Sequence, residues 1–410
     1  MAASRHPSEY RSVTDIRAPR PEELPAMIGD VELAFGGAPH PADTALDLTV
    51  LDPTRCLAVV EDGSAVATAA SLPFTMTVPG SALGVAGVTW VSVAPTHRRK
   101  GLLTAVMARQ LADLHEAGTA VAALWATEGA IYQRFGYGPA AWGLSMELPR
   151  GAPFVRPVDT AGLRLCDPAT APLATSYDEV AARTPGWWVR DGRWWSYRLH
   201  DPEHRLAGAS PLRCVVDGQD GYALYATKQS RGPGGPAGTV GLRELVARTP
   251  EAAARLWRYL LDQDLMASVH APTRPVDDPL VHLLAEPRSA QARLVDVLWV
   301  RLVSVPAALA GRRYAMPVDL VLEVVDAGCP WNAGRWRLAG DASGAVCTAT
   351  ADPADLVLDV RELGAAYLGG TPLSARARAG RVEQRTPGSL EAASTAFGWA
   401  GPAASCPMVF

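Results

Sequence analysis

Cysteine is scarce in this sequence, and no two cysteines form a CxxC pair. There are six among 410 residues. A disulfide scaffold needs a much higher density of cysteine, and a structural zinc site takes its cysteines in closely spaced pairs. Neither is indicated here, and we expect buried or half-buried free thiols at Cys56, Cys166, Cys214, Cys329, Cys347 and Cys406.

Long apolar runs and an excess of positive charge are also missing. No run reaches the roughly 20 apolar residues that span a bilayer, and the polar start MAASRHPSEYRS lacks the apolar core of a secretory signal. Lysine and arginine number 38 against 42 acidic residues, for a formal net charge of -4, which leaves no basic footprint for nucleic acid. We expect a cytoplasmic protein with no membrane or nucleic-acid partner.

Several catalytic patterns are absent as well. The sequence has no GxSxG, HExxH or P-loop pattern, which removes the motif evidence for a serine hydrolase of that type, a zinc protease or an NTPase. His200 and His204 are four residues apart, but Pro202 lies between them and the sequence offers no evident third ligand. We therefore predict no metal site.

The length suggests about three domains at roughly 150 residues each. In the first segment, 1–153, the order of elements is strand, helix, three strands, helix, strand and helix, which predicts an α+β fold with a mixed sheet. Residues 61–64, Glu-Asp-Gly-Ser, indicate a hairpin turn, and the proline-rich stretch 149–153 reads as a linker. Strands are expected at 13–17, 56–60, 65–68, 90–93, 121–125 and 141–148, and helices at 21–37 and from 102 on.

The second segment, 154–295, repeats this order more weakly. It opens with tryptophan-rich residues 187–195, and Thr249, Pro250 and an acidic first turn begin a helix. The third segment, 296–410, begins with an apolar strand at 296–302. Further strands are expected at 213–216, 221–226, 240–246, 318–325, 335–338, 346–351 and 356–360, and helices at 361–368 and 389–397.

The most informative stretch runs from 90 to 138. An apolar strand stops at Pro95, and Arg98, Arg99, Lys100 and Gly101 lead directly into a helix. The first N–H groups of a helix are unpaired and carry the positive end of its dipole, so this turn is suited to an anion such as phosphate. Taken alone, a solvated basic run beside an ordinary helix start is the simpler interpretation.

A second motif follows at the end of the next strand. Residues 93–103, VAPTHRRKGLL, together with 127–138, TEGAIYQRFGYG, resemble the acyl-CoA-binding core of GNAT acetyltransferases, and more narrowly the Eis branch of actinobacterial aminoglycoside acetyltransferases. The resemblance implies two tandem GNAT-type domains at 1–153 and 154–295, followed by a sterol-carrier-like domain at 296–410, a label of fold that does not imply bound lipid. It also implies a homohexamer built as a trimer of dimers.

The second domain differs from the first at the helix start. Its residues 246–256, VARTPEAAARL, lack both the glycine and the basic cluster. If this domain is a GNAT fold, as the resemblance implies, it has lost the coenzyme site.

The resemblance also implies which residues hold acetyl-CoA and which act on it. The strand main chain would contact the pantetheine arm and polarise the thioester carbonyl, and the helix start would hold the phosphates. Tyr132 matches the family's general acid, against the simpler interpretation of a core tyrosine. The coenzyme contacts carried over are Val91, Ser92, Val93, Arg99, Lys100, Gly101, Leu102, Leu103, Thr104, Thr127 and Glu128.

The sequence ends in apolar residues, Pro407-Met408-Val409-Phe410, which suggests that this end is buried. In Eis proteins the carboxylate of the terminal phenylalanine acts as base toward the incoming amine, and Phe410 matches that residue. Plain hydrophobic docking is the competing interpretation. A carboxylate is a weak base, so its part would be to hold the ammonium group and relay a proton through water.

The acceptor is less constrained than the reaction. We expect an acetyl-CoA-dependent N-acetyltransferase acting on amines of aminoglycosides or of related polyamine or lysine acceptors. The tryptophans at 187–195 would be either domain core or the wall of an acceptor pocket. Relatives carry acids near the first helix end and at the penultimate position, where this chain has Phe35 and Val409. The alternatives are a protein-lysine acetyltransferase and a non-catalytic acyl-CoA-sensing protein.

Overall fold

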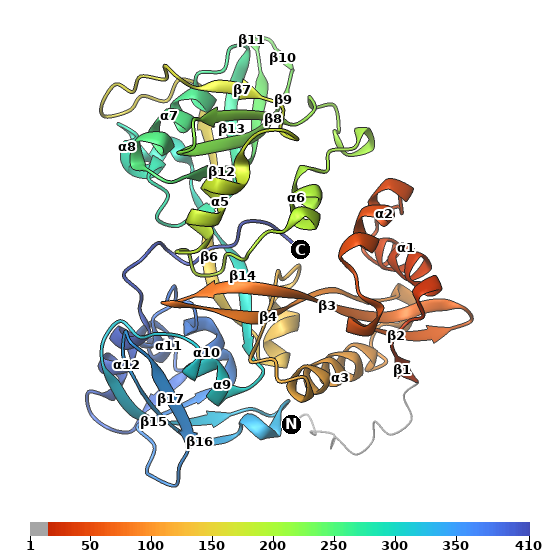
Figure 1. The fold of residues 1–410 in the computed structure, drawn as a ribbon, viewed down its shortest axis with the longest axis vertical. Helices are drawn as coiled ribbons and strands as arrows, with labels where there is room; N and C mark the ends of the chain where they lie inside the picture. The colour runs from red at the N-terminus through yellow and green to blue at the C-terminus, as the bar shows by residue number, and fades with distance from the viewer. Residues whose placement is uncertain (1–14) are drawn as a thin grey trace.

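The computed structural model describes residues 15–410, and Val13 and Thr14 of the first expected strand lie outside them. The strands form a 12-stranded sheet, a 5-stranded sheet and a separate two-stranded hairpin. Figure 1 shows the N-terminal unit in red and orange, a second unit in yellow and green, and a third in blue. Over the described residues, no helix combines the length and the apolar character of a membrane span.

The N-terminal unit covers both faces of its sheet with helices. Along β2 the side chains alternate, so that Cys56 and Ala58 pack beneath α1 while Leu57 and Val59 pack beneath α3. Burial on both faces explains why this strand is apolar throughout. The elements are β1 (Ile16–Arg17), α1 (Leu24–Ala34), α2 (Pro41–Val50), β2 (Cys56–Glu61), β3 (Ser64–Val78), β4 (Ser81–Val93), α3 (Leu102–Glu116), β5 (Val121–Leu124) and α4 (Gly129–Tyr132).

The second unit repeats this arrangement. Trp257 of α7 is fully buried against its sheet, and Thr249 caps the helix by accepting a hydrogen bond from the Ala252 N–H, as the sequence predicted. The elements are β7 (Arg164–Cys166), α5 (Leu173–Ala181), α6 (Gly192–Leu199), β8 (Arg213–Asp217), β9 (Gly221–Lys228), β10 (Arg231–Gly232), β11 (Gly235–Pro236), β12 (Gly238–Ala247), α7 (Pro250–Leu261), β13 (Met266–Pro275) and α8 (Leu280–Leu283).

The two units share one sheet, whose order is β1-β2-β3-β4-β5-β14-β6-β13-β12-β9-β8-β7. Strand β6 (Gly138–Pro149) follows the first unit in sequence but pairs with β13 of the second, and β14 (Arg293–Leu302) follows the second unit but pairs with β5 of the first. The strand expected to open the third domain at 296 therefore belongs to the large sheet. The stretch 149–153 is not a free linker either, because its backbone is hydrogen-bonded to Ala267 and Leu261.

The third unit is an α+β layer structure with the strand order β17-β16-β15-β18-β19. Its core is continuous with that of the N-terminal unit. The elements are α9 (Val305–Ala310), β15 (Val318–Val325), β16 (Gly334–Gly340), β17 (Ala345–Ala349), β18 (Leu356–Asp359), α10 (Val360–Ala366), α11 (Leu373–Arg378), β19 (Val382–Gln384) and α12 (Ser389–Phe397).

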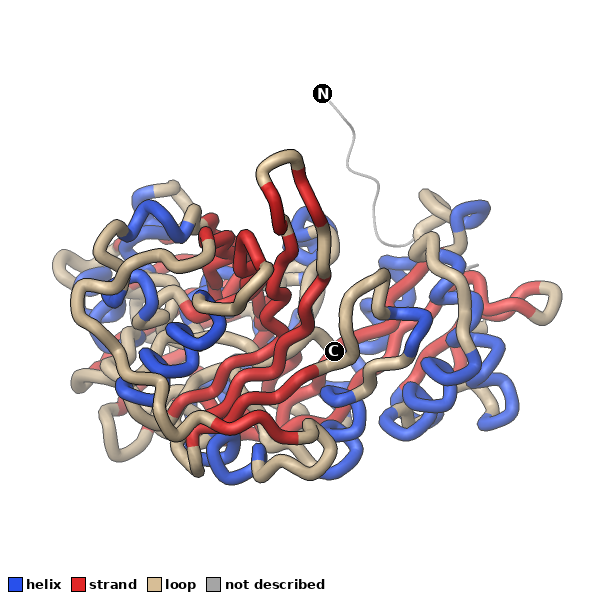
Figure 2. The backbone as a smooth tube through the Cα atoms, turned by 90° about the horizontal axis from the view of Figure 1, so that it is seen from above, coloured by secondary structure: helices blue, strands red, loops and turns tan. Residues whose placement is uncertain are grey.

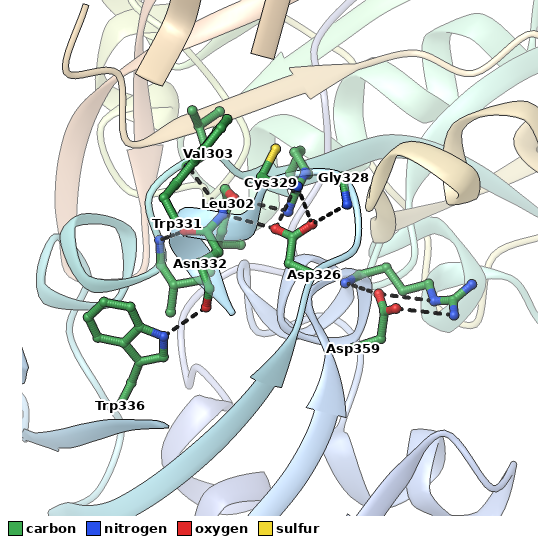
Figure 3. Close-up of polar contacts among 12 residues, drawn as sticks. Leu302, Val303, Asp326, Gly328, Cys329, Trp331, Asn332, Trp336 and Asp359 are labelled. Atoms are coloured by element: carbon green, nitrogen blue, oxygen red, sulfur yellow. Dashed lines mark hydrogen bonds and ion pairs between the residues drawn. The ribbon is translucent and has the colours of Figure 1, made fainter. Parts of the chain in front are cut away.

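A buried polar network joins β14 to the third unit (Figure 3). The guanidinium of Arg301 donates to the carboxylate of Asp326 at 2.6 Å, and both side chains are almost completely buried. Asn332 donates to the same carboxylate at 3.0 Å and accepts from the Val305 N–H at 2.8 Å. Since buried charges need partners, this network fixes how the third unit sits on the sheet.

Candidate active site

Strands β4 and β5 diverge and leave an opening in the large sheet. They run parallel and pair only over three residues, from Val85 opposite Val121 to Gly87 opposite Ala123. Among the described residues, the edge of β4 beyond Gly87 has no partner strand, whereas the other edge stays paired with β3 as far as Val93. The main chain of 91–93, where coenzyme contacts were predicted, therefore lines this opening.

A β-bulge accounts for the divergence. Trp90 has a φ of 46°, which is unusual for a residue other than glycine, and the β3–β4 register slips between Ala70 opposite Thr89 and Thr68 opposite Ser92. The Thr68 hydroxyl holds the bulge by donating to the Trp90 carbonyl at 2.7 Å. Because a bulge bends its strand, the end of β4 turns away from β5.

Helix α3 begins beside this opening. Gly101 is its N-cap, with a φ of 83°, and no side-chain cap satisfies the first N–H groups within the described residues. Leu102 is buried and Leu103 is half-buried in the core, so these residues offer a ligand mainly their main chain. This start fits an anion better than the capped start of α7 does.

The three basic residues of the turn do not play the same part. The Arg98 guanidinium donates to the Ala34 carbonyl at 3.2 Å and to the Val93 carbonyl at 3.4 Å, which ties the turn to α1 and β4. Arg99 and Lys100 are exposed, and Thr104 is exposed one turn into the helix. Arg99 and Lys100 therefore present their charges to solvent at this turn.

Tyr132 lies at the end of α4, with 7% of its surface exposed. It packs in the cluster that contains Ala86 and Val88 of β4, and its ring lies 6.0 Å from that of Tyr137. Burial raises the pKa of Tyr132 above its ordinary value, and the charge of Glu128 adds to the effect. The phenol is therefore in its protonated form at neutral pH.

The structure explains why glycine occupies two positions of the motif around Tyr132. Gly136 has a φ of 79° and ends the turn after α4. A Cβ on Gly138 would lie 2.0 Å from the Arg361 carbonyl oxygen of α10, so only glycine permits this approach of the third unit.

Thr127 and Glu128 are exposed after β5, and Thr127 also lines a cavity of about 380 Å³ next to the third unit.

Phe410 lies against β4 beside the opening. A Cβ on Gly87 would come within 3.0 Å of its ring, and the ring meets Phe74 edge-on at 4.9 Å. Val85 and Gly87 alternate along β4 with Ala86 and Val88, which pack with Tyr132. Since successive side chains of a strand face opposite ways, Phe410 and Tyr132 lie on opposite sides of β4.

The tryptophan-rich segment divides between two buried aromatic clusters. Trp188 stacks on Phe74 at 4.7 Å, and Trp194 packs against Phe74 with its ring tilted, at 5.0 Å, so that the two form an aromatic wall beside Phe410. Trp187 and Trp195 instead pack on Tyr177 in the core of the second unit. The Thr77 N–H donates to the Trp187 carbonyl and the Gly186 N–H donates to the Thr77 carbonyl, which brings this segment to the first unit.

Helix α2, which the sequence analysis did not identify, brings acidic side chains to this region. Asp47 is 7% exposed and accepts a hydrogen bond from the Tyr197 hydroxyl at 3.1 Å; the Tyr197 ring lies 5.5 Å from Trp194. Burial raises the pKa of Asp47 to about 6. Pro41 at the start and Asp43 in the first turn were the sequence signals for this helix.

Asp43 links α2 to the second unit. His200, His204 and Arg205 all donate to its carboxylate, at 2.9, 2.8 and 2.9 Å. Burial raises the pKa of Asp43, but these hydrogen bonds outweigh that effect and lower the pKa to about 2. His40 also lies close enough to form a three-residue group with Asp43 and His204 that could hold a metal ion, a grouping that the sequence did not reveal. The guanidinium of Arg205 on the same carboxylate makes the group an ion-paired tie between units.

Family models and relatives agree with this arrangement. Acetyltransferase (GNAT) domain models match residues 15–140 and 186–302, and a sterol carrier protein domain model matches 305–407. The α+β prediction of two GNAT domains followed by a sterol-carrier-like domain is confirmed. An uncharacterised N-acetyltransferase of Streptomyces coelicolor is 46% identical over 399 residues, which cover 93% of this chain and 96% of that protein.

Two relatives are Eis proteins. The N-acetyltransferase Eis of Mycobacterium tuberculosis is 33% identical over 398 residues, covering 93% of this chain and 96% of that protein. The crystal structure of Eis1 from Mycobacterium abscessus superposes with a TM-score of 0.82 at 34% identity, covering 97% of this chain and all of that one. GNAT acetyltransferases use acetyl-CoA. The chain belongs to the Eis family of GNAT proteins and is an N-acetyltransferase.

Proposed function

We propose that this enzyme moves the acetyl group of acetyl-CoA to a primary amine at the opening between β4 and β5. The observation that carries the proposal is the placement of Tyr132 and Phe410 on opposite sides of β4 beside that opening. A thioester lying in the opening would have the proton donor Tyr132 on one side and the proton acceptor, the carboxylate of Phe410, on the other.

The coenzyme would be held mainly by the main chain. The uncapped N–H groups at the start of α3, from Gly101 to Thr104, suit the pyrophosphate, with Arg99 and Lys100 as counter-charges. The unpaired edge of β4 at 91–93 suits the pantetheine arm, and an N–H on this edge would polarise the thioester carbonyl. Thr127 and Glu128 complete the set from the end of β5.

The chemical step then needs two proton transfers. The amine nitrogen attacks the carbonyl carbon and forms the C–N bond, and the collapse of the tetrahedral intermediate breaks the C–S bond. Tyr132 gives its proton to the leaving thiolate. The proton lost from the amine passes to the carboxylate of Phe410, directly or through water. The charges balance, because the phenol is reprotonated from the carboxylate through solvent.

The surroundings of Phe410 support a cationic acceptor. Aromatic faces such as those of Trp188 and Trp194 attract ammonium groups, and Asp47 adds a carboxylate beyond Tyr197. Asp47 would offset in part the acids missing near Phe35 and at Val409, whereas the Asp43 carboxylate is already paired with Arg205. We therefore propose aminoglycosides or related polyamines as acceptors.

From the family resemblance we also propose a homohexamer as the assembly. We further propose three domains, with the third beginning after β14.

The test is thiol release from acetyl-CoA with a panel of aminoglycosides, simple polyamines and lysine peptides. Tyr132→Phe is expected to lose roughly 10²- to 10⁴-fold in kcat, as when a general acid is removed. Tyr137→Phe is the matched control, because Tyr137 is fully buried and its hydroxyl has no hydrogen-bond partner among the described residues. Equal losses in the two variants would contradict the role of Tyr132.

A second variant tests Phe410. Adding two glycines after Phe410 moves the carboxylate while keeping the ring, and we expect turnover to fall with little change in the KM for acetyl-CoA. Unchanged turnover would leave Phe410 with a packing role only. Acetylation of lysine peptides in preference to polyamines would reassign the acceptor class.

A further inference from the structure

The second unit contains an opening that corresponds to the one between β4 and β5. Strands β12 and β13 run parallel and pair from Gly238 opposite Met266 to Gly241 opposite His270, and then separate. Helix α7 follows β12 as α3 follows β4. Both units therefore have a parallel strand pair that diverges next to a helix start.

The features suited to a coenzyme are replaced in this second opening. Thr249 caps the first turn of α7, and Pro250 has no N–H to offer there. The Arg274 guanidinium donates to the Leu245 carbonyl at 3.0 Å and to the Asp278 carboxylate at 2.7 Å, so it bridges the separated strands. A phosphate would find neither free N–H groups nor an unpaired cation in this bridge.

The C-terminal segment lines this second opening instead. A cavity of about 400 Å³ lies where β12, β13 and α7 meet, and Pro402, Ala403 and Ser405 form part of its wall. The Ala403 N–H donates to the Asp277 carboxylate at 2.8 Å. The Ser405 N–H donates to the Pro185 carbonyl at 3.0 Å. Figure 1 shows this blue segment crossing the middle of the molecule between the two halves of the large sheet.

Two tryptophans hold the segment from opposite units. The indole N–H of Trp187, in the second unit, donates to the Ser405 hydroxyl at 2.9 Å. The indole N–H of Trp125, at the end of β5, lies 3.1 Å from the Cys406 sulfur. Between them, a Cβ on Gly186 would lie 2.2 Å from the Ser405 carbonyl oxygen, so the segment passes directly over this glycine.

We infer that the second GNAT unit acts as a clamp whose strand opening holds residues 402–407 and so sets the position of Phe410 at the first opening. Gly186 and Trp187 touch the segment at Ser405, and all three are positioning residues because their proposed effect on the reaction is through Phe410. The effect on turnover rests on the proposed function. Whether the second unit holds residues 402–407 in place can be measured separately, without turnover.

The experiment compares Gly186→Ala and Ser405→Ala with the wild-type full chain. Gly162→Ala is the matched control: Gly162 has a φ of 90°, close to the 92° of Gly186, but no atom lies within 4 Å of its added Cβ. Two quantities are measured, the kcat and KM for acetyl-CoA by thiol release, and the hydrogen exchange of the peptide that covers 400–410. The exchange measurement needs no substrate.

We expect both clamp variants to exchange faster in this peptide, and to lose roughly 10- to 100-fold in kcat with a nearly unchanged KM for acetyl-CoA, as a displacement of about 1 Å would cause. The effects of Trp187→Phe and Ser405→Ala should be less than additive, because the two share one hydrogen bond. Exchange like that of the control, or lost activity without faster exchange, would overturn the clamp. Should the wild type acetylate no amine at all, the proposed function fails and the exchange result alone decides.

Discussion

Asp47 is a carboxylate kept inside the protein at a cost. Among the described residues its carboxylate accepts one hydrogen bond, from Tyr197, and it lies behind the aromatic wall that meets Phe410. Burial raises its pKa most; the charges of Glu32 and Asp43 add to this, and Arg205 opposes it. Carboxylates held at such a cost are concentrated at functional sites. This agrees with the proposed place of Asp47 beside the acceptor.

The pH dependence of stability tests this burial. The pKa of Asp47 is about 6 in the folded protein, above the ordinary 3.8, so the folded state binds more protons between about pH 4 and 6 and its free energy of unfolding falls as the pH rises through that window. Asp47→Asn keeps an acceptor for Tyr197 but does not titrate. In urea unfolding we expect the variant to be more stable than wild type by on the order of 2 kcal/mol at pH 7.5, and to differ little near pH 4. A difference independent of pH would contradict the raised pKa.

At the scale of elements, α3 and α7 differ in how they begin. The first N–H groups of α3 have no side-chain cap among the described residues and suit a ligand, whereas those of α7 are capped by Thr249. Gly101 leaves the N–H groups of α3 open beside the first strand opening, whereas Thr249 closes those of α7 beside the second. The two helices otherwise follow equivalent strands. The sequence analysis predicted this contrast from a glycine and a basic cluster in one place and a threonine–proline pair in the other.

Replacing Gly101 by alanine tests the open helix start. Its φ of 83° is unfavourable for alanine, and a distorted turn would move the N–H groups and the cations that we assign to the phosphates. Gly118→Ala is the control, since Gly118 has a φ of 72° at the other end of the same helix, with nothing within 4 Å of the added Cβ. Calorimetry should give a Kd for coenzyme A about tenfold weaker in Gly101→Ala only. An equal change of Kd in Gly101→Ala and Gly118→Ala would mean that backbone strain in α3, and not the open helix start, causes the effect.

At the scale of the whole molecule, the three units are joined by strands and buried contacts rather than linked in series. Strands β6 and β14 lie side by side at the middle of the sheet, each paired with the unit to which it is not adjacent in sequence. Figure 2 shows the strands running through the molecule, with the C-terminus close to them at its centre. The Arg301–Asp326 pair anchors the third unit to the same β14.

This joining predicts one cooperative transition and a large effect of the buried pair. Asp326→Ala leaves the Arg301 charge buried without its partner, which costs roughly 3–5 kcal/mol. Asp319→Ala breaks an exposed pair with Arg337 and should leave the thermal midpoint nearly unchanged. Calorimetry at a fixed scan rate should show a clearly lower midpoint for Asp326→Ala in a single transition. A separate early transition would mean that the third unit unfolds alone.

The candidate site was partly accessible to sequence reasoning. The residues from Arg99 to Thr104 and Tyr132 were identified from the family resemblance that two local motifs carry, and the structure gathers them around one opening; their roles stay proposals. Asp47 was missed because its helix was not identified. The third potential ligand near His204 was missed because His40 and Asp43 are some 160 residues away in sequence and meet it only in the folded chain.

Local patterns in the sequence determined the α+β class, the hairpin at 61–64, the strand and glycine turn before α3, and the cap of α7, because each depends on neighbouring residues only. Tertiary structure alone decided the exchange of β6 and β14, since pairing partners far apart in sequence leave no periodic signal in either strand. It also decided which tryptophans face Phe410. The path of 402–407 through the second opening follows from contacts with Gly186, Trp187 and Asp277, which no pattern around Phe410 encodes.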